Sequence, residues 1–298
     1  MSDSPLCCPT TGIEKILLST DGSDSSKGAT AVAISLAKVC SGKLYATVVI
    51  ETNPEFEAFA PQLVEKAENE AKQQLEDVKA AALKEGVQCE LIVHHGDEPY
   101  KLIVEDAAKM QADMIVMGRR GRTGLKRLMM GSVTAKVIGH SHCKVLVVPG
   151  AAKPDWKNVL AATDGSKQGN KAVMEAITIA KRCGSCLTIV SSIASDDLVE
   201  LEDSRIFLKD IAAEMIAAME KNIRELKELA LKEGVKAEGF VLSGNPAEAI
   251  INTAKENKAD LIVVGSHGRT GLDRLLMGSV TERIIVLSSC TVLVVKAA

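Results

Sequence analysis

GRRGRTGLKRLMMGS at residues 118–132 and GSHGRTGLDRLLMGS at residues 265–279 are two versions of one glycine- and arginine-rich loop. The segments around the loop also recur in the same order: ILLSTDGS (16–23) and VLAATDGS (159–166), ADMIVMG (112–118) and ADLIVVG (259–265), and CKVLVVP (143–149) and CTVLVVK (290–296). Such self-similarity indicates a duplicated structural unit. The stretch PGAAKPDWKN at 149–158 is typical of a linker between domains. We therefore predict two copies of one domain, residues 1–150 with a flexible lead at 1–12, and residues 151–298.

Each copy alternates apolar runs with segments of helical pattern. In the first copy the apolar runs are KILLST (15–20), LYATVVI (44–50), VQCELIVH (87–94), DMIVMG (113–118) and KVLVVP (144–149). Several of these runs are apolar throughout, which is typical of strands covered on both faces in a parallel sheet. The predicted fold class is α/β, with two tandem Rossmann-like, doubly wound domains, each a five-stranded parallel sheet sandwiched by helices.

The composition limits the function classes. The chain has 298 residues and a formal net charge of −3, and its aromatic residues are one Trp, two Tyr and four Phe. Without a basic field or stacking aromatics, nucleic acid is not the expected partner. We find neither an export signal nor an apolar run of about 18–20 residues, and therefore expect a cytoplasmic protein without a membrane span. In that compartment we expect the eight cysteines to be reduced thiols and not a disulfide framework.

The repeated loop has the chemistry of an anion site. Ligands of doubly wound sheets bind beyond the carboxyl ends of the strands, where the winding direction reverses. Gly118 and Gly121 let the backbone approach a ligand closely, and Gly131-Ser132 begins a helix whose free amides favour phosphate. The hydroxyls of Ser132 and Thr134 could add donors. The first loop carries the positive residues Arg119, Arg120, Arg122, Lys126 and Arg127, whereas the second has Arg269 and Arg274 against Asp273, which favours polyphosphate at the first.

With Asp-Gly-Ser after the first strand and Gly-x2-Gly-x9-Gly-Ser after the fourth, both present twice, the chain resembles the universal stress protein family in its tandem form over nearly its whole length. The ATP-binding branch of that family implies an aspartate at the adenosine, an apolar second-strand residue against adenine, and the glycine loop around the phosphates. Carried over by position, the first site consists of Asp21, Val49, Gly118, Gly121, Arg122, Gly131, Ser132, Val133 and Thr134. The second consists of Asp164, Gly265, Gly268, Arg269, Gly278, Ser279, Val280 and Thr281. Ser192 stands where the first copy has Val49, which weakens the apolar floor for adenine in the second site.

The resemblance implies a regulatory stress-response protein that binds ATP, AMP or ADP at two sites. The sequence shows no nucleophile–base grouping and no Walker lysine loop, so we expect no catalytic residues and at most weak ATP hydrolysis. Magnesium accompanying the phosphates stays open, since no carboxylate ligands for it stand out. In this family two domains pair through their last strands, and VLVV at 145–148 and 292–295 could do so within one chain as a pseudo-dimer. A homodimer of tandem chains and an unidentified regulatory partner are also expected.

Several alternatives remain at this stage. Asp21 and Asp164 could serve only as turn and capping residues. A hydrolase or adenylyl-transfer relative of the same fold, or a scaffold that ignores nucleotide, would use the same architecture. Cys183–Cys186 (CGSC) matches a redox spacing, and HSHC at 140–143 or Cys89 with His94 and His95 could suggest a metal, although both groupings are more simply structural.

The site assignment makes a direct prediction. Gly131→Val combined with Gly278→Val should abolish stabilisation by nucleotide, because the branched side chains fill the space beside the helix amides. The fold itself should stay largely intact. Thermal melting with and without ATP measures both effects, and a shift that persists in the double variant would contradict the assignment.

Overall fold

The computed structural model describes residues 7–10, 12–121, 129–150, 155–193, 207–268 and 277–296. The chain divides into two compact units, residues 1–153 and 154–297, apart from the last residue of the chain. Arg122, Lys126, Arg127, Arg269, Asp273 and Arg274 lie outside the described residues. Among the described helices, none is long and apolar enough to cross a membrane.

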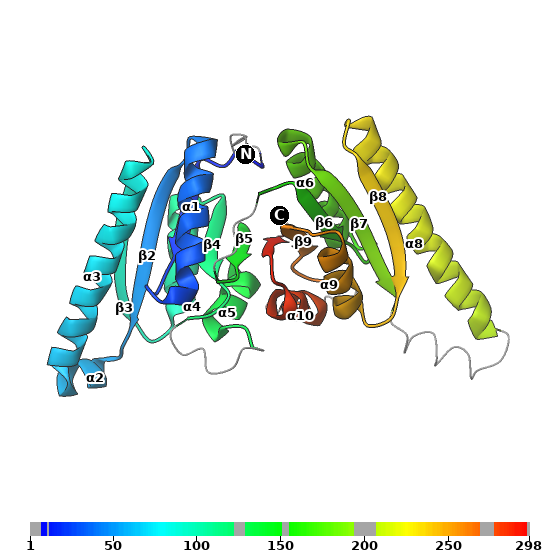
Figure 1. The fold of residues 1–298 in the computed structure, drawn as a ribbon. Coiled ribbons are helices and arrows are strands. Elements are labelled where there is room, and N and C mark those ends of the chain that lie inside the picture. Colours follow the sequence, from blue (N-terminus) through cyan, green and yellow to red (C-terminus); the bar gives the residue numbers. More distant parts are fainter. Residues whose placement is uncertain are drawn as a thin grey trace. The chain divides into compact units, whose positions relative to one another are not determined.

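The first unit is a five-stranded parallel sheet. Its strands are β1 (Lys15–Ser19), β2 (Lys43–Glu51), β3 (Cys89–Gly96), β4 (Met114–Gly118) and β5 (Lys144–Val148). They pair in the order β3-β2-β1-β4-β5, so the winding direction reverses between β1 and β4. The helical elements are η1 (Asp24–Ser26), α1 (Lys27–Cys40), α2 (Pro54–Phe59), α3 (Pro61–Lys84), α4 (Pro99–Met110) and α5 (Ser132–His140). The predicted doubly wound α/β fold is confirmed (Figure 1).

The second unit repeats this topology. Its strands are β6 (Asn158–Ala162), β7 (Cys186–Ile193), β8 (Ala237–Ser243), β9 (Leu261–Gly265) and β10 (Thr291–Val295). They pair in the order β8-β7-β6-β9-β10. The helices are α6 (Lys167–Cys183), α8 (Phe207–Lys232), α9 (Pro246–Glu256) and α10 (Ser279–Leu287). A counterpart of α2, which the sequence did not predict, is absent from the described part of this unit.

The core of each unit lies on both faces of its central strands. Every residue of β4, β9 and β10 is buried. In the first unit α1 packs on β1 and β4 while α3 packs on β2 and β3, and α4 lies against β2 and β1. The continuous apolar runs in the sequence are therefore explained by helices on both sides of the sheet.

Cysteine oxidation differs from the prediction. Cys8 and Cys40 form a disulfide with their Cα atoms 4.7 Å apart, so the prediction of reduced thiols is wrong for this pair. The segment before β1 lies beside the end of α1, a proximity that the spacing of cysteines in the sequence does not reveal. Cys89, Cys143, Cys186 and Cys290 are not in disulfides, so the two cysteines of the CGSC motif are not bonded to each other.

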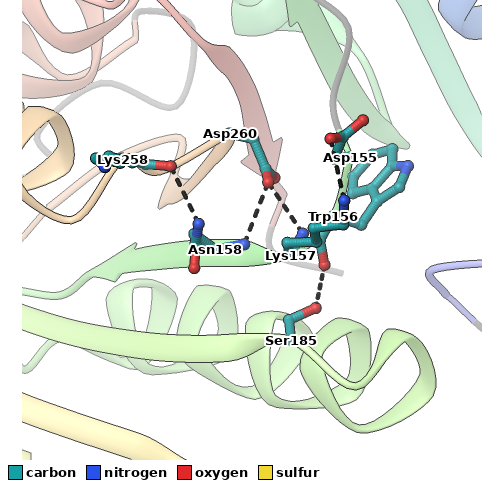
Figure 2. A network of polar contacts seen from close by, with 7 residues as sticks. All are labelled: Asp155, Trp156, Lys157, Asn158, Ser185, Lys258 and Asp260. Carbon is teal, nitrogen blue, oxygen red and sulfur yellow. Dashed lines mark hydrogen bonds and ion pairs between the residues drawn. The ribbon is translucent and has the colours of Figure 1, made fainter. Parts of the chain in front are cut away.

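A half-buried aspartate anchors the first strand of each unit. In the first unit, Asp113 Oδ2 accepts hydrogen bonds from the amides of Glu14 and Lys15, at 2.8 and 2.9 Å. In the second, Asp260 Oδ2 accepts from the amides of Lys157 and Asn158, at 2.9 and 3.2 Å (Figure 2). These bonds join the strand start to the residue before the neighbouring strand. The central pair of each sheet is thereby held in register at its amino end.

The ionised form of Asp260 is electrostatically unfavourable in the folded protein. Burial raises the pKa of its carboxyl group, and the amide donors of Asn158 and Lys157 only partly oppose this effect. Its second oxygen, Oδ1, is buried without a hydrogen-bond partner among the described residues. The ionised form is therefore less well stabilised in the folded protein than in water.

Asp260→Asn tests this interpretation, because the amide side chain keeps an acceptor for the two backbone donors but cannot ionise. A raised pKa means that the folded protein takes up the proton at a higher pH than the unfolded chain does. Lowering the pH from about 7 should therefore stabilise the wild type relative to the variant, with the gain complete below the unfolded-chain value of about 3.9. Urea unfolding of both proteins across this range measures the difference. A difference that is independent of pH would contradict the raised pKa.

Candidate functional site

The two loop motifs meet their aspartates at the carboxyl edge of each sheet. β1 and β4 are parallel neighbours, with Ser19 opposite Met117. The residues that follow, Asp21 on one side and the segment from Gly118 on the other, therefore leave the sheet side by side. β6 and β9 are paired in the same way in the second unit. The structure thus brings together the parts of each site that the sequence separates by about a hundred residues.

One oxygen of each aspartate closes a turn. Asp21 Oδ1 accepts from the amide and the hydroxyl of Ser23, at 3.1 and 2.7 Å. Asp164 Oδ1 accepts from the amide of Ser166 at 2.9 Å. Ser166 in turn caps α6 by accepting from the amide of Gly169. The alternative that these aspartates are turn residues is therefore confirmed for one oxygen of each.

The other oxygen of each aspartate faces the glycine loop. A Cβ atom added to Gly121 would lie 2.9 Å from Asp21 Oδ2, and one added to Gly268 would lie 2.7 Å from Asp164 Oδ2. Both separations are shorter than real Cβ atoms show, so a side chain at either glycine would have to displace the carboxylate. The described residues therefore place Asp21 with Gly121, and Asp164 with Gly268, as single clusters.

Bare helix ends complete the cradles. Gly131 is the N-cap of α5 and Gly278 is the N-cap of α10, and neither helix has a side-chain cap. The first backbone bond of each helix comes from the fourth residue along, Ala135 to Gly131 and Glu282 to Gly278. The amides of residues 132–134 and 279–281 therefore have no acceptor within the helix. Anions are attracted to such a group of donors at a helix N-terminus.

The glycines fall into two classes by what a side chain would meet. A Cβ at Gly118 would lie 3.2 Å from the Ser25 carbonyl oxygen, and one at Gly265 would lie 3.2 Å from backbone atoms of Gln168. These glycines let the end of β4 or β9 pack closely against the first helical turn after the neighbouring strand, at η1 in the first unit and at the start of α6 in the second. At Gly131 and Gly278, by contrast, the nearest atoms lie at 3.6 and 3.5 Å, ordinary contact distances. Their backbone angles, φ −65° and −62°, also suit any residue. The fold itself does not require glycine there.

The threonine hydroxyls of the motif bond to the ends of the strands. The Thr134 hydroxyl donates to the Gly118 carbonyl at 3.1 Å, and the Thr281 hydroxyl donates to the Gly265 carbonyl at 2.8 Å. In this structure the Thr134 hydroxyl proton is therefore already used within the protein. The bond fixes the helix N-terminus behind the strand end. Only the amide of Thr134 remains available as a donor.

The charges around the two cradles differ. In the first unit Arg120 Nε donates to the Met129 carbonyl at 3.0 Å, which joins the two described ends of the loop. Burial lowers the pKa of the Arg119 guanidinium, and the neighbouring charge of Arg120 adds to this effect. An arginine stays protonated at neutral pH despite such a shift. In the second unit Ser266 and His267 occupy the corresponding positions, and Glu282 lies in the first turn of α10. The first cradle is therefore the more electropositive of the two in the described residues.

The second-strand residues lie where the motif implies. Val49 is half-buried near the end of β2, and Ser192 is half-buried at the corresponding place in β7. The Ser192 hydroxyl has no hydrogen-bond partner among the described residues. Val133 is half-buried and Val280 is 39% exposed, while Ser132 and Ser279 are exposed at the helix starts. Arg122 and Arg269 lie outside the described residues.

The structure contains a buried polar network near Val49 that was not predicted from the sequence. His94 Nε2 lies 3.0 and 2.8 Å from the two oxygens of Asp106, and the Thr47 hydroxyl donates to Asp106 at 3.2 Å. The sequence drew attention to His94 only as a possible metal ligand. Among the described residues no group of three or more His, Cys, Asp or Glu side chains could hold a metal ion. The only signal in the sequence was an aspartate on the apolar face of a helix.

Duplicated, doubly wound sheets with a glycine loop at each switch point define a tandem α/β protein of the Rossmann-like type. The sequence profile described as the universal stress protein family matches residues 12–149 and 155–296, and the chain belongs to that family. A universal stress protein of Methanocaldococcus jannaschii is 40% identical over 139 residues, covering 45% of this chain and 81% of the relative. One of Mycobacterium tuberculosis is 30% identical over 200 residues, covering 62% of each chain. A crystal structure of a universal stress protein from Archaeoglobus fulgidus has a TM-score of 0.73 at 23% identity over 97% of this chain and 98% of that one, which shows the shared fold.

The two glycine classes predict opposite mutational effects. Gly118→Ala should lower the free energy of unfolding by about 1–3 kcal/mol, because its methyl group presses on the backbone at Ser25. Gly131→Ala should cost about 1 kcal/mol or less, since its methyl has room and only the helix start is affected. Denaturant titrations of the two single variants measure the contrast. Equal losses would show that the two classes do not differ.

Proposed function

We propose that the protein is a regulatory adenine-nucleotide-binding protein with one site in each unit. The observation that carries this proposal is the glycine N-cap of α5 and of α10. Each glycine has ordinary backbone angles and space for a side chain, yet leaves three helix amides open at the switch point. A purely structural connector would gain stability from Ser, Asp or Asn there. A glycine is the better choice where the phosphates of a ligand supply the cap.

The remaining residues suit the rest of such a ligand. The family resemblance implies that Asp21 and Asp164 lie at the adenosine, where Oδ2 of each faces the loop glycine. A carboxylate oxygen is a strong acceptor for sugar hydroxyls. Val49 supplies an apolar surface at the end of β2. Phosphate at the helix end and ribose at the aspartate fit a nucleotide lying across the carboxyl edge of the sheet.

The first site should bind more tightly than the second. Arg119 and Arg120 lie at the first cradle, whereas Glu282 places a negative charge beside the open amides of the second. Ser192 also replaces the apolar contact of Val49. Magnesium carried with the phosphates would compensate part of the negative charge in either site.

Two other functions compete with this proposal. A slow ATP hydrolase, or an adenylyl-transferring relative, would release a defined product at more than a trace rate. A scaffold would be indifferent to nucleotide, with pairing through β5 and β10, within one chain or between chains, as its main property. The open helix amides favour binding over scaffolding, because a scaffold has no use for them.

Nucleotide released by acid from the purified protein tests the proposal first. ATP, ADP or AMP at one or two molecules per chain supports binding and counts the sites. Added ATP should then raise the melting temperature of nucleotide-free protein by linkage. A melting temperature that millimolar ATP leaves unchanged would favour the scaffold.

Gly131→Ser combined with Gly278→Ser provides a sharper test. A serine at an N-cap accepts from its own helix amides, so the nucleotide-free protein should gain a few tenths of a kcal/mol in stability. The same side chains compete with phosphate, so the melting shift induced by ATP should fall strongly. Thermal melting with and without ATP measures both, and the wild type is the control. A double variant that is more stable and still shifts fully with ATP would refute the phosphate assignment.

A further inference from the structure

The residues beside the two proposed sites exchange polarity between the units. In the first unit β2 pairs with β3 so that Val49 lies opposite His94. In the second unit β7 pairs with β8 so that Ser192 lies opposite Leu242. Each register pair therefore contains one apolar and one polar side chain, but the polar one lies on the outer strand in the first unit and on the inner strand in the second.

His94 lies on the same face of the sheet as Val49. The Thr47 hydroxyl and the His94 ring both reach Asp106 of α4, so both side chains point to the α4 face. Val49 is two residues beyond Thr47 on the same strand and points to that face as well. Neighbouring strands are about 5 Å apart, so a flat group resting on Val49 would reach the ring of His94.

Asp106 fixes which nitrogen of His94 carries a proton. Asp106 is 4% exposed, and both of its oxygens lie within 3.0 Å of His94 Nε2. A carboxylate only accepts hydrogen bonds, so Nε2 is the protonated nitrogen. In the neutral imidazole Nδ1 is then an acceptor. Within the described residues, no hydrogen bond engages Nδ1, and the side chain is 26% exposed.

The described residues of the second unit form no such network. Val190, whose carbonyl accepts from Thr163 as that of Thr47 accepts from Thr20, occupies the place of Thr47. Thr253 occupies the place of Asp106, and its hydroxyl donates to Ala249 of its own helix. The polar group left at the register pair is the hydroxyl of Ser192, which can donate or accept.

We propose that His94 selects the nucleobase in the first unit, with Asp106 and Thr47 as its positioning residues; this inference rests on the proposed function. His94 Nδ1 accepts a hydrogen bond from the exocyclic amino group of adenine. A base with a carbonyl oxygen at the same position is disfavoured, because two acceptors would then face each other. The second unit, with Leu242 at this place and a rotatable hydroxyl at Ser192, does not distinguish the two. One chain therefore combines an adenine-selective site with a permissive one.

The experiment compares ATP with ITP, in which a carbonyl oxygen replaces the amino group. Gly278→Val confines binding to the first unit and Gly131→Val confines it to the second. By titration calorimetry, ATP should bind the first unit about tenfold more tightly than ITP, the effect of one hydrogen bond, and the second unit about equally. The matched variant Thr47→Val with His94→Leu and Asp106→Thr gives the first unit the residues of the second. In this variant the Kd for ITP divided by the Kd for ATP should fall to about one.

Each outcome supports or overturns the role of His94 in base selection. A preference that survives the triple substitution, or an equal preference in both units, overturns the inference while leaving the proposed function in place. Failure of both nucleotides to bind the wild-type protein overturns the proposed function and this inference with it. If the triple variant does not show a cooperative melting transition, the comparison between the Gly278→Val and Gly131→Val proteins decides, because both retain the network. A merely structural role for His94 would not change the ratio of the two affinities.

Discussion

The architecture depends on a helix that starts without a side-chain cap directly behind the carboxyl end of a central strand. The Thr134 hydroxyl holds that start against the Gly118 carbonyl, and Thr281 does the same at Gly265. The bond fixes the direction of α5 and α10, so the open amides point over the sheet edge. Without it the helix dipole would still exist, but its position relative to the aspartate turn would not be defined. The proposed binding of phosphate therefore relies on a hydroxyl that never needs to contact the ligand.

Within one loop, the glycines that the fold requires can be told apart from those that only a ligand would require. Gly118 and Gly265 allow close packing against neighbouring backbone, and Gly121 and Gly268 leave room for a carboxylate. Neither requirement applies at Gly131 and Gly278, where a side chain has space. A glycine that the fold does not need weakens the isolated protein slightly, because a better N-cap is available. A ligand phosphate that caps the helix would offset that small loss. An energetic disadvantage in the free protein, and not a matching pattern alone, thus favours an anionic ligand at these helix starts.

Much of this arrangement could be predicted from the sequence. The apolar runs predicted the strands because a parallel sheet buries both faces, and the repeated Asp-Gly-Ser and Gly-Ser segments predicted which strand ends meet. Pairings between distant side chains could not be predicted. The bond between Cys8 and Cys40 depends on where the chain lies before β1, and the contact of His94 with Asp106 depends on which helix covers which strand. The bond from the Thr134 hydroxyl to Gly118 could not be predicted either, because a sequence shows that a donor is present but not that a carbonyl uses it.

Duplication allows the two ends of a site to diverge independently. The proposed phosphate end consists of backbone amides and glycines, which offer few side chains to change, and the helix starts have the same geometry in both units. The proposed base end consists of side chains on β2, β3 and their counterparts, and there the two units differ at both members of one register pair. A buried carboxylate is costly unless it is fully paired, and Asp106 meets that condition only because Thr47 and His94 are both present. The three residues therefore act as one unit, and their joint replacement by Val190, Leu242 and Thr253 in the second domain exchanges one complete chemical environment for another.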